Sequence, residues 1–239
     1  MPIFHLPERI VFPSPAFARK DGLLAVGGDL SPKRLLLAYS MGIFPWYSDD
    51  DPIIWWSPDP RLVLYPDELR VSRSLKKVIK KGIFHVTVDT AFAEVIHSCA
   101  HVRLKNNEGT WIVDDMIEAY CNLHKAGFAH SVEAWYGGEL AGGLYGVSLG
   151  RCFFGESMFT RVSNASKVAF VRFVEYLKEQ SFDMIDCQMT TAHLTRFGAR
   201  EIPRDDFLAQ LEESLEAPTQ RGKWCFDSNI MNPYQINSG

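Results

Sequence analysis

The chain has 239 residues, of which 46% are hydrophobic and 23% are charged, and its formal net charge is -4 at pH 7. This balance is typical of a soluble globular protein with a sizeable core, and it excludes a disordered polypeptide. The net negative charge excludes a generally basic nucleic-acid-binding protein, so clusters of positive charge have to be judged locally.

The lengths of the apolar runs and the pattern of cysteines indicate the cellular location of the protein. No apolar run approaches the roughly 20 residues that cross a membrane, so we expect no membrane partner. The N-terminus lacks the basic stretch and the apolar segment of a secretory signal. The five cysteines are odd in number, widely spread and without a CxxC pair, as expected for reduced thiols: Cys99, Cys121, Cys152, Cys187 and Cys225. The sequence therefore predicts a cytoplasmic protein.

Residues 1–62 are rich in Pro, Gly and Trp, and we expect them to form a small N-terminal domain. Ser31 followed by Pro32 favours the start of a helix, and Gly42 favours its end. Beyond this helix, prolines interrupt the chain every few residues and predict irregular structure. Trp46 lies in this loop-like sequence, as do two further tryptophans.

Residues 63–239 are expected to form the second domain. It begins with a basic helix over 71–82, a strand over 83–89 and amphipathic helices over 90–101 and 111–127. The basic helix carries five cations and no acid: Arg73, Lys76, Lys77, Lys80 and Lys81. Such cations repel one another unless an anion offsets them, and a phosphate backbone is one such anion. The charge pattern leaves open whether this helix is a solvated face or a nucleic-acid contact.

A strand meander over 129–136, 139–150 and 151–159 follows, with turns between the strands. The next helix, over 163–180, places Phe170, Phe173, Val174 and Leu177 on one face, and Ser163 or Asn164 can cap its start. A strand over 183–189 and a helix over 204–215 come last. This order predicts an α+β fold with a mainly antiparallel sheet flanked by helices, as in acetyltransferase-type folds.

Glu156 lies within the apolar stretch GRCFFGESMF, where a buried carboxylate requires a partner. Asp186 and Gln188 belong to the strand beyond the amphipathic helix. If the two strands are neighbours, three polar groups converge above an apolar pocket, which is how a small-ligand site is built. The alternative is a buried salt bridge from Glu156 to Lys167 or Arg161.

Other residue patterns have simpler explanations. His97, Cys99 and His101 are close in sequence, but positions i and i+2 of a helix face different ways and no companion has zinc-ligand spacing, so we predict no metal site. Strand alternation places Cys187 on the face opposite Asp186 and Gln188, where a buried thiol is the default.

Five segments together resemble the leucyl/phenylalanyl-tRNA–protein transferase family: GIFPWYS, WWSPDPR, EGTW, GGLYGVSLGRCFFGESMFTRVSNASK and IDCQ…HL…GAREIPR. The resemblance runs over nearly the whole chain, from GLLAVGGDLSP to EIPRDDF. It implies an enzyme that moves Leu or Phe, and less well Met, from aminoacyl-tRNA to a protein beginning with Arg or Lys. The product carries an N-degron for proteolysis. The resemblance also implies an acetyltransferase-like (GNAT-like) C-terminal domain and no metal or coenzyme. We expect the protein to be a monomer.

The resemblance also assigns roles to individual positions. The pocket for the transferred side chain would be formed by Leu144, Phe153, Met158, Phe170, Phe173, Leu177 and Ile185. Trp46 and Trp111 would hold the terminal adenosine, and the basic helix would meet the acceptor stem. Glu156, Asp186 and Gln188 would be the catalytic polar residues. We expect Asp186 to orient or deprotonate the attacking amine, Gln188 to hydrogen-bond it, and Glu156 to bind a cationic group of a substrate.

Two other functions compete with this one. A small-molecule acyltransferase would use coenzyme A, but the phosphate loop of such enzymes is absent before the helix over 163–180. An RNA-binding module would use the basic helix and the tryptophans without catalysis, and it leaves Glu156, Asp186 and Gln188 unexplained.

Overall fold

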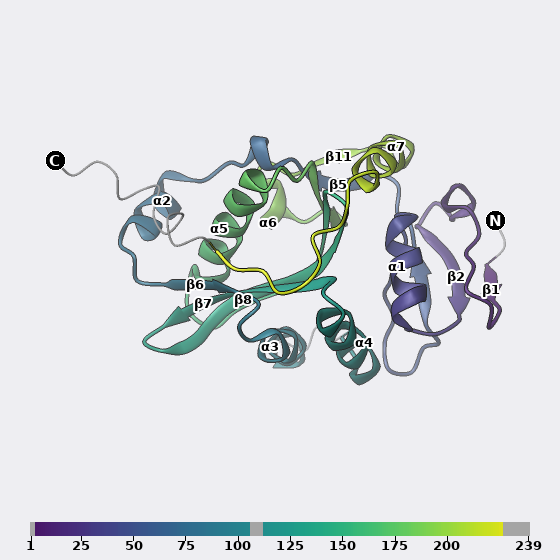
Figure 1. Cartoon of the computed structure of the whole chain (residues 1–239), viewed down its shortest axis with the longest axis horizontal. Helices are drawn as coiled ribbons and strands as arrows, with labels where there is room; N and C mark the ends of the chain where they lie inside the picture. Colours follow the sequence, from purple (N-terminus) through teal and green to yellow (C-terminus); the bar gives the residue numbers. More distant parts are fainter. Residues whose placement is uncertain (1–2, 106–111, 227–239) are drawn as a thin grey trace.

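The computed structural model describes residues 3–105 and 112–226 (Figure 1). Among these residues, no helix is long and apolar enough to cross a membrane. The described residues form two sheets, one of four strands near the N-terminus and one of seven strands.

The N-terminal region contains more regular structure than its prolines predict. Its four short strands run in the order β1-β2-β4-β3: β1 (Phe4–Leu6), β2 (Leu23–Gly27), β3 (Phe44–Pro45) and β4 (Ile54–Trp56). Beyond the helix α1 (Pro32–Ser40) the segment forms no long element, as expected, but the prediction of irregular structure missed its two short strands, β3 and β4. The strands have two to five residues each, and Trp55, which is fully buried, fixes the sheet against the core.

Helix α1 (Pro32–Ser40) forms where the sequence predicts it. The Ser31 side chain accepts a hydrogen bond from the Arg34 backbone N–H, and Pro32 occupies the first turn. Gly42, with a φ of 68°, then turns the chain away from the helix.

The seven-stranded sheet has the order β11-β5-β10-β9-β8-β7-β6. In this sheet only the β10–β9 pair is parallel, because the helix α5 (Ala165–Glu179) connects these strands; the other pairs are antiparallel. The strands are β5 (Arg61–Leu64), β6 (His85–Val88), β7 (Ala129–Tyr136), β8 (Glu139–Leu149), β9 (Cys152–Thr160), β10 (Met184–Gln188) and β11 (Arg200–Ile202). The α+β class with a helix-flanked, mainly antiparallel sheet is confirmed.

Helices cover both faces of this sheet. Helix α5 lies on one face, and α3 and α4 lie on the other (Figure 1). The helices of this part of the chain are α2 (Arg73–Lys80), α3 (Phe92–Lys105), α4 (Asp114–Lys125), α5 (Ala165–Glu179), α6 (Ala192–Thr195) and α7 (Arg204–Leu215); short 3-10 turns occupy Pro15–Phe17 and Pro66–Glu68. The apolar stripe predicted for α5 is buried against the sheet.

The start of α5 differs from the prediction. Neither Ser163 nor Asn164 caps it through a side chain: Asn164 occupies the cap position in the left-handed region, with a φ of 71°, and its amide donates to the Ser163 hydroxyl instead. Asn tolerates this backbone conformation better than most residues, which explains its place at a sharp strand-to-helix turn.

Strand β5 begins at Arg61, so the domain boundary expected after residue 62 falls inside a strand of the large sheet. One continuous apolar cluster joins the two sheets: it contains Leu24 and Trp55 of the N-terminal region together with Tyr120 and Phe154. The N-terminal region thus shares this cluster, and its helix α1 contacts β8, α4 and α7.

Candidate active site

A cavity of about 640 Å³ lies between α5 and strands β8, β9 and β10. This volume is within the range of small-ligand sites. Six of the seven residues predicted for the amino-acid pocket line it: Leu144, Phe153, Met158, Phe170, Phe173 and Ile185. Leu177 does not line the cavity and is buried in the apolar cluster around it.

The lining follows from the sheet register and the helix period. Leu144 pairs with Met158, and Ile185 pairs with Phe153, so their side chains share the face that α5 covers. Gly146 leaves room for this arrangement: a Cβ there would lie 2.6 Å from the Phe153 ring and 2.1 Å from a backbone oxygen. Glycine is therefore required at this position.

Glu156 lies at the polar wall of the cavity and is 8% exposed. Its carboxylate accepts hydrogen bonds from the hydroxyls of Tyr39, at 2.7 Å, and Tyr120, at 2.9 Å, and from the side-chain amide of Gln188, at 2.8 Å. Tyr39 comes from α1 and Tyr120 from α4, and the two hydroxyl oxygens also contact each other. Each hydroxyl has one proton, so while both donate to the carboxylate neither donates to the other.

The alternative explanation for Glu156, a salt bridge to Lys167 or Arg161, is not found in the described part of the structure. Arg161 donates to the Ser98 hydroxyl and the Leu140 carbonyl instead, and no cation of the described residues pairs with Glu156. The three hydrogen bonds come from neutral groups, so they satisfy the oxygens without balancing the charge. Burial raises the pKa of Glu156 to about 7, although the tyrosine and glutamine hydrogen bonds act to lower it.

This pKa predicts how stability depends on pH. Unfolded, the carboxyl has a pKa near 4.5, so between pH 4.5 and 7 the folded protein holds the proton more tightly and loses stability as the pH rises. The loss is about 3 kcal/mol once both states are ionised. We expect Glu156→Gln to remove this slope, and unfolding in urea at pH 5 and pH 8 measures it. An unchanged slope in the variant would contradict the assignment.

Asp186 does not reach the cavity. It is fully buried, and both carboxylate oxygens bind the Arg61 guanidinium, at 2.8 and 2.6 Å. One of these oxygens also accepts the backbone N–H of Gln188, at 2.8 Å. Arg61 further donates to the Gly42 carbonyl and lies over the rings of two phenylalanines. This geometry favours a positioning role for Asp186 over contact with a substrate amine.

Strand alternation fails between Asp186 and Gln188. The register with β5 shifts there, and Gln188 has a φ of 61°, so its side chain turns toward Glu156. As a result, Cys187 and Gln188 both line the cavity and Asp186 faces away. The prediction that Asp186 and Gln188 share a face and leave Cys187 behind was wrong. Burial raises the pKa of the Cys187 thiol far above its usual range, so it is an apolar part of the wall.

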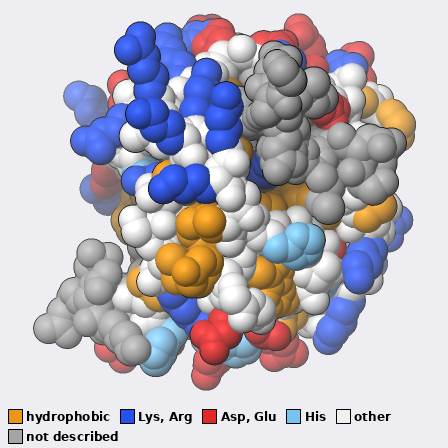
Figure 2. Space-filling model, turned by 90° about the vertical axis from the view of Figure 1, so that its left-hand side faces the viewer, with side chains coloured by type: hydrophobic (Ala, Val, Ile, Leu, Met, Phe, Trp, Pro, Cys, Tyr) orange, Lys and Arg blue, Asp and Glu red, His pale blue; other side chains and the backbone are white. Residues whose placement is uncertain are grey.

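The predicted nucleic-acid contacts lie around this centre. Trp46 lines the cavity and packs on Trp56, with ring centroids 5.5 Å apart, whereas Trp111 lies outside the described residues. All five cations of the basic helix are exposed, and none forms an ion pair with a described residue: Arg73, Lys76, Lys77 and Lys80 on α2, and Lys81 at its end. Lys and Arg side chains gather on the face of the molecule that carries α2 (Figure 2).

Sequence reasoning missed the residues that hold the polar centre from other elements: Tyr39, Tyr120 and Arg61. Helix periodicity marks both tyrosines as buried, but nothing local to them shows that they converge on Glu156. Within the described residues, no group of three or more His, Cys, Asp and Glu side chains is arranged to hold a metal ion.

Comparisons with known proteins match nearly the whole chain to one family. A family model described as Leucyl/phenylalanyl-tRNA protein transferase matches residues 63–212, and one for the N-terminal domain of that family matches residues 28–59. A relative from Desulfatibacillum aliphaticivorans, named leucyl/phenylalanyl-tRNA–protein transferase, is 61% identical over 228 residues, which cover 95% of this chain and 98% of the relative.

Two further relatives carry the same name. The one from Desulforapulum autotrophicum is 57% identical over 226 residues, which are 95% of this chain and 99% of the relative. The one from Anaeromyxobacter sp. strain Fw109-5 is 60% identical over 228 residues, which are 95% of this chain and 97% of the relative. Among solved structures, a conserved protein of unknown function from Bacteroides thetaiotaomicron has a TM-score of 0.42 and 10% identity, over 85% of this chain and 69% of that one.

Proposed function

Because the chain belongs to the leucyl/phenylalanyl-tRNA protein transferase family and is an aminoacyltransferase, we propose that it moves Leu or Phe, and less well Met, from aminoacyl-tRNA to the N-terminal Arg or Lys of a protein. The product then carries an N-degron. Family membership favours this function over a coenzyme A acyltransferase or a non-catalytic RNA-binding module. We further propose that the protein acts in the cytoplasm as a monomer.

The apolar cavity is the observation that carries this proposal. Its lining includes Leu, Ile, Met and Phe side chains together with polar residues, among which Glu156 and Gln188 contact each other. A bulky apolar amino acid would bury its side chain against the apolar lining and place its ester carbonyl beside Glu156 and Gln188. A hydrophobic pocket separates neighbouring side chains by only about 1–3 kcal/mol per methylene or two, which fits a relaxed choice among Leu, Phe and Met.

The reaction requires positioning more than strong base catalysis. Converting an ester of the tRNA ribose into an amide runs downhill and needs no ATP. An α-amino group has a pKa of roughly 7.7–8.0, so a substantial fraction is already neutral near pH 7. The enzyme therefore has to hold this amine against the ester carbonyl and stabilise the charge that develops.

Gln188 is placed to hold the amine. Its amide N–H donates to Glu156, which leaves its carbonyl oxygen to accept a hydrogen bond from the attacking nitrogen. An amide is too weak a base to take the proton outright. Asp186 contributes by binding the backbone N–H of Gln188 and the guanidinium of Arg61, which fixes the end of β10 in its unusual conformation.

Glu156 would bind a positive charge of a substrate. Its hydrogen bonds are satisfied by the protein, but its charge is not, so a cationic amino group or the basic end of the acceptor would stabilise the ionised carboxylate. Trp46 stands at the same cavity, where it would stack on the terminal adenosine together with Trp111.

The proposal is tested by incubating the protein with radiolabelled Phe-tRNA and peptides that differ only in beginning with Arg, Lys or Ala. We expect label in the peptides that begin with Arg or Lys and little in the one that begins with Ala. Equal labelling of all three peptides, or none, would end the proposal.

The basic helix gives a separate prediction. Replacing Lys76, Lys77, Lys80 and Lys81 together with Ala should weaken tRNA binding and flatten its dependence on salt, with the slope falling by roughly one for each phosphate that the protein no longer neutralises. Lys20→Ala with Lys33→Ala, which removes two exposed cations from the N-terminal region, is the control. Filter binding between 50 and 200 mM salt measures both; an unchanged slope would make this helix a solvated face.

A further inference from the structure

The C-terminal strap, residues 216–226, leaves α7 and runs across the molecule past the large sheet (Figure 1). Trp224 is its anchor and is 5% exposed. The indole ring packs among aromatic side chains from β7, β9, α5 and the segment after it: His130, Phe153, Phe173, Tyr176 and Phe182. These contacts bury the indole ring and fix the strap against the large sheet and α5.

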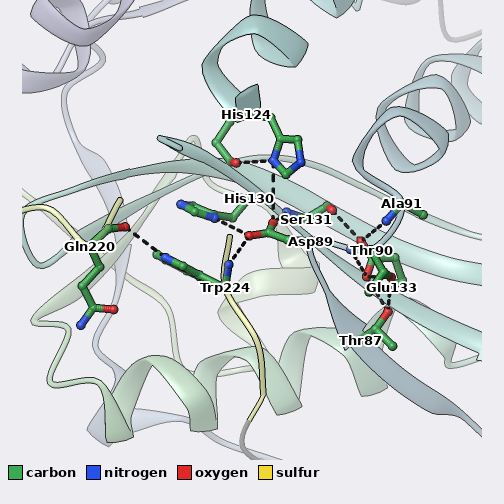
Figure 3. Close-up of polar contacts among 11 residues, drawn as sticks. Thr87, Asp89, Thr90, Ala91, His124, His130, Ser131, Glu133, Gln220 and Trp224 are labelled. Atoms are coloured by element: carbon green, nitrogen blue, oxygen red, sulfur yellow. Dashed lines mark hydrogen bonds and ion pairs between the residues drawn. The ribbon is translucent and has the colours of Figure 1, made fainter. Parts of the chain in front are cut away.

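Polar contacts fix Trp224 in place (Figure 3). Its backbone N–H donates to Asp89, at 2.8 Å, and its indole N–H donates to the Gln220 carbonyl, at 3.0 Å. Asp89 also binds the His130 ring nitrogen Nδ1, at 2.8 Å, and the Ser131 backbone N–H, at 3.0 Å. The His130 ring stacks on the indole with centroids 3.6 Å apart.

This anchor touches the wall of the cavity from behind. Phe153 and Phe173 line the cavity, and their ring centroids lie 6.4 and 6.3 Å from that of Trp224, which does not line it. The two phenylalanines contact each other edge to face, at 4.6 Å. Gly146 lies against the Phe153 ring. The rings are thus confined between the cavity and the strap.

We propose that Trp224 is a positioning residue for the choice of donor amino acid, which it sets by holding Phe153 and Phe173 against the cavity. The inference rests on the proposed function, because it assigns the cavity to the transferred side chain. Protein interiors are close-packed, so removal of the indole leaves space into which the two rings can retreat. The cavity then deepens, which favours Phe over the smaller Leu.

The experiment compares kcat/KM for Phe-tRNA and Leu-tRNA with one Arg-initiated peptide. For Trp224→Leu we expect the Phe-to-Leu ratio to rise about tenfold, since one or two methylenes of depth are worth that much. Trp224→Phe keeps an aromatic ring behind Phe153 and Phe173, so its Phe-to-Leu ratio should stay within about threefold of the wild-type ratio. Leu24→Ala, a fully buried site in the N-terminal sheet, controls for general destabilisation and should leave the ratio unchanged.

Asp89→Asn supplies a second arm that keeps every aromatic ring. It replaces one carboxylate oxygen by an NH2 group, so it weakens the contacts of Asp89 with the strap and with His130 and Ser131 of β7, and it should raise the ratio in the same direction. If Trp224→Leu does not fold, the Phe-to-Leu ratio of Asp89→Asn tests the inference in its place. Equal losses for both donors, or an unchanged ratio, would overturn the inference while wild-type transfer still upholds the proposed function; no transfer by the wild-type protein would overturn both.

Discussion

Gln188→Met should lower kcat/KM for transfer of Phe about 100-fold or more while leaving the affinity for Phe-tRNA within about threefold of wild type. Methionine matches the length of glutamine but has no group that can bind the attacking amine. It also removes a hydrogen bond from Glu156, so the carboxyl becomes harder to ionise. Both changes act at the step in which the amine meets the ester.

Single-turnover transfer and equilibrium tRNA binding measure the two quantities separately. Gln180→Met, at the end of α5 and outside the cavity lining, is the matched control and should retain full activity. A Gln188→Met enzyme with a normal rate would remove Gln188 from the reaction. A loss confined to tRNA affinity would assign it to donor binding instead.

Asp186→Ala should destabilise the folded protein by about 3–5 kcal/mol, because it leaves the Arg61 guanidinium buried without its carboxylate. The double variant Arg61→Met with Asp186→Leu removes both charges and should recover most of this loss. Asp67→Ala breaks the exposed pair with Lys178 and should cost less than about 1 kcal/mol.

Urea unfolding measures these free energies, and transfer assays on the same proteins separate stability from turnover. Arg61 also donates to the Gly42 carbonyl, so Asp186→Ala, which frees the Arg61 side chain, should also loosen the junction between the N-terminal region and β10. If Asp186→Ala were as stable as wild type but inactive, Asp186 would act directly on the substrate and the positioning role would be wrong.

Part of the cavity could be predicted because its pattern is local. The apolar stripe on α5 contains Phe170 and Phe173, which line the cavity, and the strands before and after this helix supply other lining residues. The full set of pocket residues was implied by the family resemblance. Short strands could not be predicted so well: β5 and β11 have three or four residues each, and pairing with neighbours, rather than propensity, holds them in place.

The polar centre could be predicted only in part. Tyr39 and Tyr120 reach Glu156 from helices 117 and 36 residues away, and periodicity reveals that a side chain is buried but not which partner it meets. Side-chain alternation does not hold at the end of β10, because Gln188 adopts a positive φ. The hydrogen bond from the Gln188 backbone N–H to the Asp186 carboxylate stabilises this conformation. Such a conformation depends on Arg61, far away in sequence, and leaves no local signal.

A crystal structure with 3′-amino-3′-deoxyadenosine carrying phenylalanine in amide linkage would test the central claim most directly. We predict the phenyl ring between Leu144, Phe153 and Phe173, with the amide next to Gln188. A phenyl ring bound outside this cavity, with the cavity walls unmoved, would contradict the account.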